Sequence, residues 1–68
     1  MERKTVTSSN IESVGYKDGV LEVEFKSGKI YQYESVPATL ADQLVRAPSV
    51  GRFFAQHVKG SYPERAAA

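Results

Sequence analysis

The chain of 68 residues contains no cysteine. This absence excludes a disulfide framework and a metal site built on thiolates, and it is typical of the cytoplasm, where we expect this protein. Long apolar runs are also missing, whereas a membrane-spanning helix needs about 20 consecutive apolar residues. The first residues lack the apolar stretch of a signal peptide. We therefore expect no interaction with a membrane.

Histidine is scarce too, since His57 is the one histidine of the chain. No cluster of acids or cysteines accompanies it, so we expect no metal and no cofactor. A nucleophile at Ser8 or Ser9 with His57 as its base would lack an orienting carboxylate and a strained turn. Glu22, Glu24 and Glu34 lack the pocket and the partner acid with a raised pKa that acid–base catalysis requires. We therefore expect no catalytic residues and a protein that is not an enzyme.

Charge is nearly balanced, with a net value of +1, but it is distributed unevenly. Residues 1–34 carry five Lys and Arg against six Asp and Glu, whereas residues 35–68 carry four against two. The second half of the chain is therefore expected to form a weakly basic side.

Residues 16–36 show the pattern of two consecutive β-hairpins. Leu21, Val23 and Phe25 alternate with charged residues, which is typical of a strand with one buried and one exposed face. Tyr31 and Tyr33 alternate with polar residues in the next strand in the same way. This stretch therefore predicts the central part of an antiparallel sheet.

The two turns set the register of these strands. Asp18-Gly19 predicts a two-residue turn. The second turn could have two or three residues. A two-residue turn would place Tyr31 opposite Glu24. A three-residue loop with Gly28 in the left-handed conformation places Tyr31 opposite Val23 instead. We favour the longer loop because it keeps the apolar side chains on one face.

The opposite face of these strands is mostly charged, and Val20 and Ile30 are its apolar exceptions. With the central strand between them, these two residues predict a small apolar spot. Such a spot could bind a protein partner or a second copy of this chain, although scattered apolar residues are also normal on a surface.

Two amphipathic helices are predicted after the strands. Val36-Pro37 predicts the start of the first, and Pro48 its end. Ser49 predicts the N-cap of the second, which runs to about Lys59 and directs His57 inward.

These elements predict an α+β fold, a three-stranded antiparallel β-meander with two C-terminal α-helices packed on one face (βββαα). We expect residues 11–63 to form a single domain. Residues 1–10 are expected to be a flexible segment or a short edge strand, and residues 64–68 a disordered tail. The predicted core draws on both layers: Tyr16, Leu21, Val23, Phe25, Tyr31, Tyr33, Leu40, Leu44, Phe53, Phe54, Val58 and Tyr62.

One side of the second helix carries residues that could contact nucleic acid. Arg52, Gln56 and Lys59 recur at helical spacing, and Arg46 lies near them in the sequence. This pattern predicts contacts with the phosphates of RNA or DNA, or an ordinary solvated helix face. Tyr31 and Tyr33 are also candidates for base stacking, although the strand pattern places them in the core.

The chain resembles the KTSC domain family, named for the C-terminus of some lysyl-tRNA synthetases and including many small bacterial proteins. The resemblance covers about residues 6–63. It is carried by the Ser8-Ser9 pair, Gly15-Tyr16, the LEVEF strand, Tyr31-x-Tyr33, Val36-Pro37, Ser49-x-Gly51 and the ending from Phe54 to Tyr62. The resemblance implies no catalytic or binding residues. It suggests RNA binding, because the domain of this family is attached to a synthetase in some proteins.

We therefore predict a non-enzymatic binding or accessory module that contacts RNA or DNA through a weakly basic helical face. The alternative is a protein-interaction or homodimerisation module that uses the outer sheet face or a strand edge.

Overall fold

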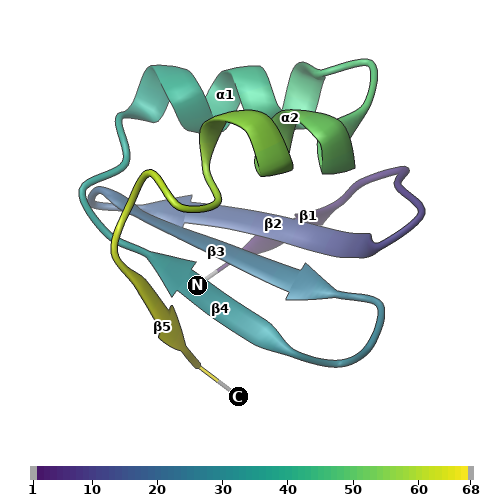
Figure 1. Ribbon diagram of the computed structural model, residues 1–68, viewed down its shortest axis with the longest axis horizontal. Coiled ribbons are helices and arrows are strands. Elements are labelled where there is room, and N and C mark those ends of the chain that lie inside the picture. The colour runs from purple at the N-terminus through teal and green to yellow at the C-terminus, as the bar shows by residue number, and fades with distance from the viewer. Residues whose placement is uncertain (1, 68) are drawn as a thin grey trace.

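A computed structural model describes residues 2–67 of the chain. Five strands form one antiparallel sheet in the order β1-β2-β3-β4-β5, and both helices lie on one of its faces (Figure 1). The elements are β1 (Arg3–Thr5), β2 (Ile11–Lys17), β3 (Val20–Phe25), β4 (Ile30–Tyr33), α1 (Ala38–Arg46), α2 (Val50–His57) and β5 (Glu64–Ala66). The α+β class and the pair of helices on one face are confirmed.

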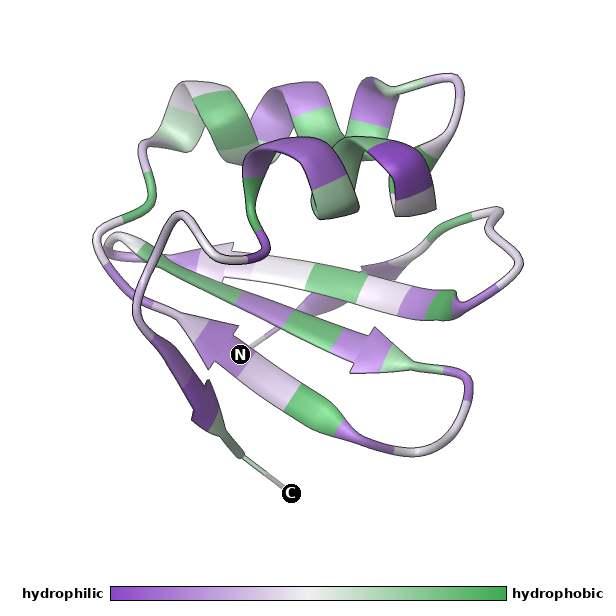
Figure 2. Cartoon of the chain, viewed as in Figure 1, coloured by the Kyte–Doolittle hydropathy of each residue, from purple (hydrophilic) through white to green (hydrophobic). Residues whose placement is uncertain are grey.

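The three central strands have the predicted register. Tyr16 lies opposite Leu21, while Tyr31 lies opposite Val23 and Tyr33 opposite Leu21. Because side chains alternate between faces, this register directs all five toward the helices. Figure 2 shows the resulting alternation of hydrophobic and hydrophilic bands along β3.

Both turns have the predicted conformations. Asp18 and Gly19 have positive φ angles of 50° and 82°, as a type I′ turn requires. Gly28 has a φ of 97°, and the Phe25 N–H donates to the Lys29 carbonyl at 2.8 Å. The three-residue loop is therefore confirmed, and it depends on a glycine that tolerates the left-handed region.

The sheet has five strands rather than the predicted three. β1 is the short edge strand that was one alternative for residues 1–10, and Met1 lies outside the described residues. β5 replaces most of the disordered tail predicted for residues 64–68, while Ala68 again lies outside the described residues. Glu64–Ala66 is short and polar, so no apolar alternation marks it. Its pairing depends on β4, where Tyr33 lies opposite Glu64.

A β-bulge in β2 explains a core residue that the sequence pattern missed. Simple alternation would place Ile11 and Ser13 on the same face. The register shifts between them, so that Ile11 lies opposite Phe25 while Ser13 lies opposite Glu24. The extra residue turns Ile11 toward the helices, where it is fully buried.

The core lies between the helices and the sheet. Among the predicted core residues, the buried ones are Leu21, Val23, Tyr33, Leu44, Phe54 and Val58, and those half-buried against them are Tyr16, Phe25, Tyr31, Leu40, Phe53 and Tyr62. The core also contains Ile11, Val14, Val36, Ala41 and Val50.

The second helix begins as predicted but ends earlier. Ser49 is its N-cap, and the Ser49 hydroxyl accepts from the Arg52 N–H at 3.4 Å. The helix ends at His57 rather than near Lys59. His57 is exposed rather than inward: it lies about 60° around the helix from the buried Phe54, and it is the last residue of α2.

Gly15 is required for β1 to lie beside β2. A Cβ at this position would lie 2.5 Å from the Glu2 carbonyl oxygen and 2.8 Å from Arg3 Cγ. Arg3 lies directly opposite Gly15 and extends over it to reach Glu22 on β3. A side chain on Gly15 would therefore push β1 away from the sheet.

We expect Gly15→Ala to lower the free energy of unfolding by about 1–3 kcal/mol, because the added methyl group overpacks this contact. Urea denaturation measures the change. Glu12→Ala is the control, since Glu12 is an exposed residue of the same strand and should change stability by less than about 0.5 kcal/mol. An equally small effect for Gly15→Ala would contradict the close approach of β1.

Candidate functional site

The outward side of α2 presents three polar side chains, Arg52, Gln56 and Lys59, which we call the α2 surface. All three are exposed. Arg52 and Gln56 are one helical turn apart, and Lys59 follows in the turn after the helix, where its N–H donates to the Phe54 carbonyl at 3.0 Å. The predicted alignment of these residues on one side therefore extends past the end of the helix.

The positive charges of the α2 surface form no ion pair among the described residues. Within residues 2–67, neither Arg52 nor Lys59 has a carboxylate oxygen within 4.0 Å of its charged nitrogen atoms. Both groups are therefore available to an anionic ligand.

Arg46 is less available than the other candidate residues. It ends α1, and its Nε lies 3.3 Å from Asp42 Oδ1. Both side chains are largely exposed, so this ion pair is weak and solvent competes with it. Residues 47–49 join the two helices, which places Arg46 at the same end of the helical pair as Arg52.

Phe53 and His57 pack against each other beside the α2 surface. Their ring centroids are 4.5 Å apart, and the rings are tilted by 42°. Phe53 is half-buried and His57 is exposed. Within residues 2–67, no group of three or more metal-binding side chains gathers around this histidine or elsewhere.

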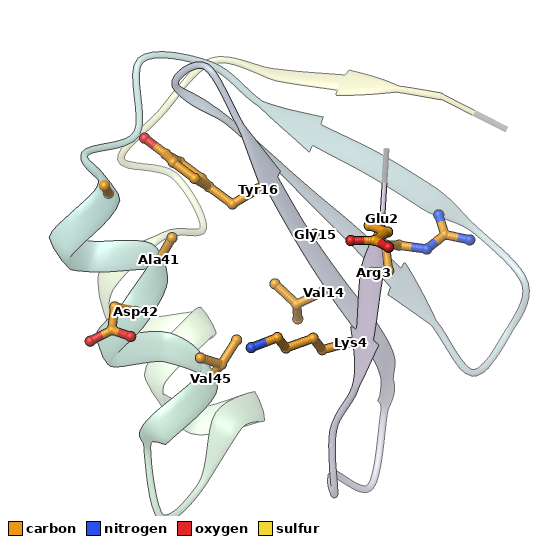
Figure 3. Close-up of a pocket in the computed structure, with 10 residues that line it drawn as sticks. Glu2, Arg3, Lys4, Val14, Gly15, Tyr16, Ala41, Asp42 and Val45 are labelled. Carbon is orange, nitrogen blue, oxygen red and sulfur yellow. The ribbon is translucent and has the colours of Figure 1, made fainter.

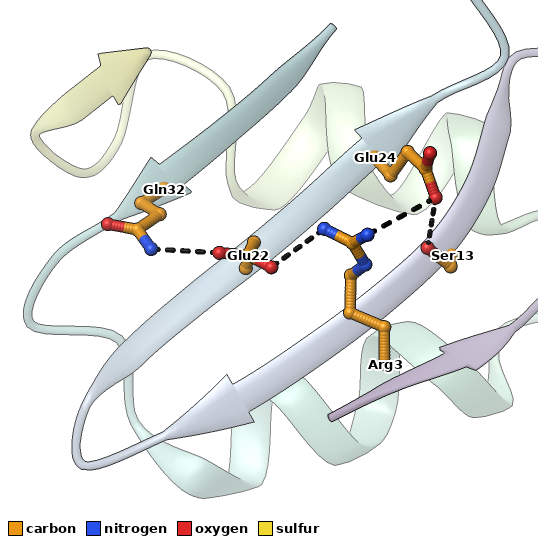
Figure 4. A network of polar contacts seen from close by, with 5 residues as sticks. All are labelled: Arg3, Ser13, Glu22, Glu24 and Gln32. Atoms are coloured by element: carbon orange, nitrogen blue, oxygen red, sulfur yellow. Dashed lines mark hydrogen bonds and ion pairs between the residues drawn. The ribbon is translucent and has the colours of Figure 1, made fainter. Parts of the chain in front are cut away.

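The outer face of the sheet, opposite the helices, carries a polar network (Figure 4). Arg3 Nη1 donates to Glu22 Oε2 at 2.8 Å, and Gln32 Nε2 donates to Glu22 Oε1 at 2.8 Å. Glu24 accepts from the Ser13 hydroxyl at 2.8 Å and lies 3.6 Å from Arg3 Nη2. Glu22 and Glu24 therefore hold strands together.

The network reaches the last strand through Arg65. Its Nη2 donates to Gln32 Oε1 at 3.0 Å, and its Nη1 lies 3.2 Å from Glu34 Oε2. Side chains from all five strands thus take part, which occupies most of the polar groups on this face.

Val20 and Ile30 lie apart on the outer face. Val20 pairs with Lys17, whereas Ile30 pairs with Glu24. The hydrogen-bonded pair of Glu22 and Gln32 lies between them. The structure therefore does not bring these two residues together into the apolar spot predicted from the sequence.

A cleft of about 570 Å³ separates α1 from β1 and β2 (Figure 3). Val14, Ala41 and Val45 give it apolar walls, and Lys4 reaches from β1 toward Val45. Its volume falls in the range of ligand pockets, although it is open to solvent at the sheet edge.

A smaller cavity of about 310 Å³ lies under α2, and we call it the α2 cavity. Its lining combines aromatic residues of β3, β4 and α2, two small residues of α2, and polar residues from other segments. These residues are Asn10, Phe25, Tyr31, Tyr33, Gly51, Phe54, Ala55, Lys59 and Glu64. Lys59 thus belongs both to the α2 surface and to this cavity. Sequence reasoning missed it because its lining residues are far apart in the chain.

The sequence model of the KTSC domain matches residues 7–62. The chain belongs to the KTSC domain family. A solved structure, the KTSC domain protein of Yersinia pestis, superposes with a TM-score of 0.92 at 37% identity, covering 98% of this chain and 97% of that protein. An uncharacterised protein of Stutzerimonas stutzeri is 44% identical over 61 residues, which are 87% of this chain and 86% of the relative.

Part of the chain also matches a longer protein. A lysine–tRNA ligase of a Nostoc species is 45% identical over 42 residues, which are 62% of this chain. The match spans 8% of the ligase.

Within residues 2–67 of the present chain, no helix is long and apolar enough to cross a membrane.

Two stretches that carry the resemblance to KTSC domains meet in space. The Ser8 hydroxyl accepts from the Asn10 and Ile11 N–H groups, both at 3.3 Å, and donates to Asn10 Oδ1 at 3.1 Å. A Cβ on Gly51 would lie 2.7 Å from Asn10 Oδ1 and 3.3 Å from the Ser8 hydroxyl. Gly51 therefore lets α2 approach the turn that Ser8 stabilises.

Tyr33 connects the core of the KTSC domain to β5. Its hydroxyl donates to Glu64 Oε2 at 2.6 Å. Burial, reinforced by this hydrogen bond, raises the pKa of Tyr33 above its ordinary value. The neutral phenol is thus favoured in the folded state, and the unfolded chain loses this proton at a lower pH than the folded chain does.

We expect the stability from Tyr33 to be complete below pH about 10 and to be lost as the pH rises above that value. Tyr33→Phe should cost about 1–3 kcal/mol at neutral pH through loss of the hydrogen bond to Glu64. The variant should also show a weaker decline in alkali. Urea unfolding across this pH range tests both effects, with Tyr62→Phe as the matched control. Parallel alkaline declines for the wild type and Tyr33→Phe would contradict this assignment.

Proposed function

We propose that this KTSC domain is a non-enzymatic module that binds RNA through the α2 surface. The observation that carries the proposal is the separation of charge between the two layers. The outer face of the sheet holds Glu22, Glu24 and Glu34, all engaged by arginines. Residues 38–59 contain a single acid, Asp42, against Arg46, Arg52 and Lys59.

Unpaired cations on one side of a helix suit the RNA backbone. Arginine and lysine side chains contact phosphates, and such contacts position a protein without reading sequence. Gln56 lies between Arg52 and Lys59 and adds a neutral hydrogen-bonding group. The lysine–tRNA ligases among the relatives are consistent with a role beside RNA.

Salt dependence tests this proposal. If Arg46, Arg52 and Lys59 each contact a phosphate of a single-stranded RNA, affinity should fall about twentyfold when the salt concentration rises fourfold. Fluorescence anisotropy with a labelled single-stranded RNA measures the slope. A DNA oligomer of the same sequence shows whether the sugar matters.

The double variant Arg52→Glu with Lys59→Glu should abolish RNA binding, because both charges reverse. Lys26→Glu with Lys29→Glu is the matched control, since it makes the same change of net charge on exposed residues around the loop between β3 and β4. Equal losses in the two double variants, or no binding by the wild type at low salt, would refute the proposal.

A second candidate function is the docking of an extended protein segment on β1. Val6 donates its N–H to Glu12, and Lys4 lies opposite Val14. Because hydrogen-bonded pairs alternate along an antiparallel ladder, the N–H groups of Arg3 and Thr5 point away from β2. The cleft below α1 opens at this same edge, so an added strand could place a side chain in it.

Thr5→Pro should prevent such pairing while leaving the fold intact, because it removes an outward N–H from an edge strand. If a second copy occupies the edge, sedimentation should show dimers at high concentration for the wild type and monomers for the variant. Ile30→Lys serves as the comparison for pairing through the outer face. A wild-type chain that stays monomeric at high concentration would exclude the dimer.

A further inference from the structure

The α2 cavity has aromatic walls. The Phe54 ring packs edge-to-face on Phe25 and on Tyr33, with centroid distances of 5.5 Å and 5.4 Å. Phe25 packs edge-to-face on Tyr31 at 6.0 Å. Phe54 and Tyr33 are buried, whereas Phe25 and Tyr31 are half-buried. These last two rings are therefore the ones that a ligand can reach.

The cavity is lined by one charged group of each sign, Glu64 and Lys59. The Glu64 carboxylate already accepts from the Tyr33 hydroxyl. The Lys59 ammonium has no carboxylate within 4.0 Å among residues 2–67. An unpaired lysine at the rim of an aromatic pocket attracts an anionic group beside the guest, whereas aromatic rings alone would attract a cation. A planar ring that carries a nearby negative charge fits both features.

Asn10 adds a hydrogen-bond donor to the same cavity. Its Oδ1 accepts from the Ser8 hydroxyl at 3.1 Å, and Gly51 closes in on that oxygen. Among the described residues, Asn10 Nδ2 makes no hydrogen bond, so its two hydrogens are free for a ligand. A carbonyl oxygen on the edge of a heterocycle is the natural acceptor for them.

We propose that the α2 cavity receives one unstacked RNA base, with the rings of Phe25 and Tyr31 against the base and Lys59 on the adjoining phosphate. The inference rests on the proposed RNA binding and names the part of the ligand that enters the protein. Single-stranded RNA commonly presents splayed bases that stack on aromatic side chains. Lys59 joins the two sites because it belongs to both the α2 surface and the cavity.

Ala55→Leu tests the cavity without removing any ring. Ala55 is exposed on α2 and lines the cavity, so leucine should fill its mouth and keep the helix, since leucine is a good helix former. Gln43→Leu is the matched control, because Gln43 is exposed on α1 and lies outside the cavity. The probes are uridine monophosphate, the other three ribonucleoside monophosphates and a single-stranded RNA oligomer.

Loss of one stacked base should weaken oligomer binding by Ala55→Leu about five- to a hundredfold, while Gln43→Leu stays within twofold. In NMR titrations of the wild type, a monophosphate should shift the amide signals of Asn10, Tyr31 and Lys59, and Ala55→Leu should abolish these shifts. Tyr31→Phe should retain binding because it keeps the ring.

Four outcomes separate the inference from the proposed function. Loss of affinity confined to Ala55→Leu supports both. Oligomer binding that Ala55→Leu leaves unchanged overturns the cavity inference and leaves RNA binding intact. Monophosphate shifts at Asn10 and Tyr31 without oligomer binding support the base site and overturn RNA binding as the function. Absence of binding with every probe at low salt overturns both.

Discussion

The packing of Phe54 against the sheet is the contact on which the rest of this KTSC domain depends. Its ring meets Tyr33 and Phe25 edge-to-face, so one helical side chain touches two neighbouring strands. Without a covering layer, the apolar face of the sheet would be exposed to water, which is unfavourable. Phe54 therefore joins the helices to the strands, and the same ring forms a wall of the α2 cavity.

The two outer faces of the molecule use charge in different ways. On the sheet, Arg3 and Arg65 form ion pairs with Glu22, Glu24 and Glu34. The resulting network connects both edge strands to the central strands. On the helices, Arg52 and Lys59 have no such partners among the described residues. Charges that stabilise the fold and charges that can meet a ligand thus lie on opposite sides, despite a net charge of +1.

The sequence predicts the features of this fold that depend on local patterns. Alternation along β3 and the turns at Gly19 and Gly28 fix the register of the central strands. Local patterns fail where a distant partner decides the outcome. The bulge turns Ile11 into the core, and β5 forms only because β4 offers it an edge.

The candidate site divides in the same way. Helical spacing predicts that Arg52, Gln56 and Lys59 share one side of the chain, and their exposure agrees with this. The α2 cavity is not predictable from spacing, because Asn10, Tyr31 and Lys59 come from three separate segments. Their meeting depends on the close approach of Gly51 to the turn at Ser8, which only the folded chain reveals.

The two flanks of the sheet consist of strands only three residues long, β1 and β5. So few backbone hydrogen bonds, with little apolar burial behind them, make these the regions of lowest local stability. Transient fraying would release Arg3 and Arg65 from their carboxylate partners while the inner strands and helices persist. The negative charge exposed on the outer face would then vary as the two edge strands open and close.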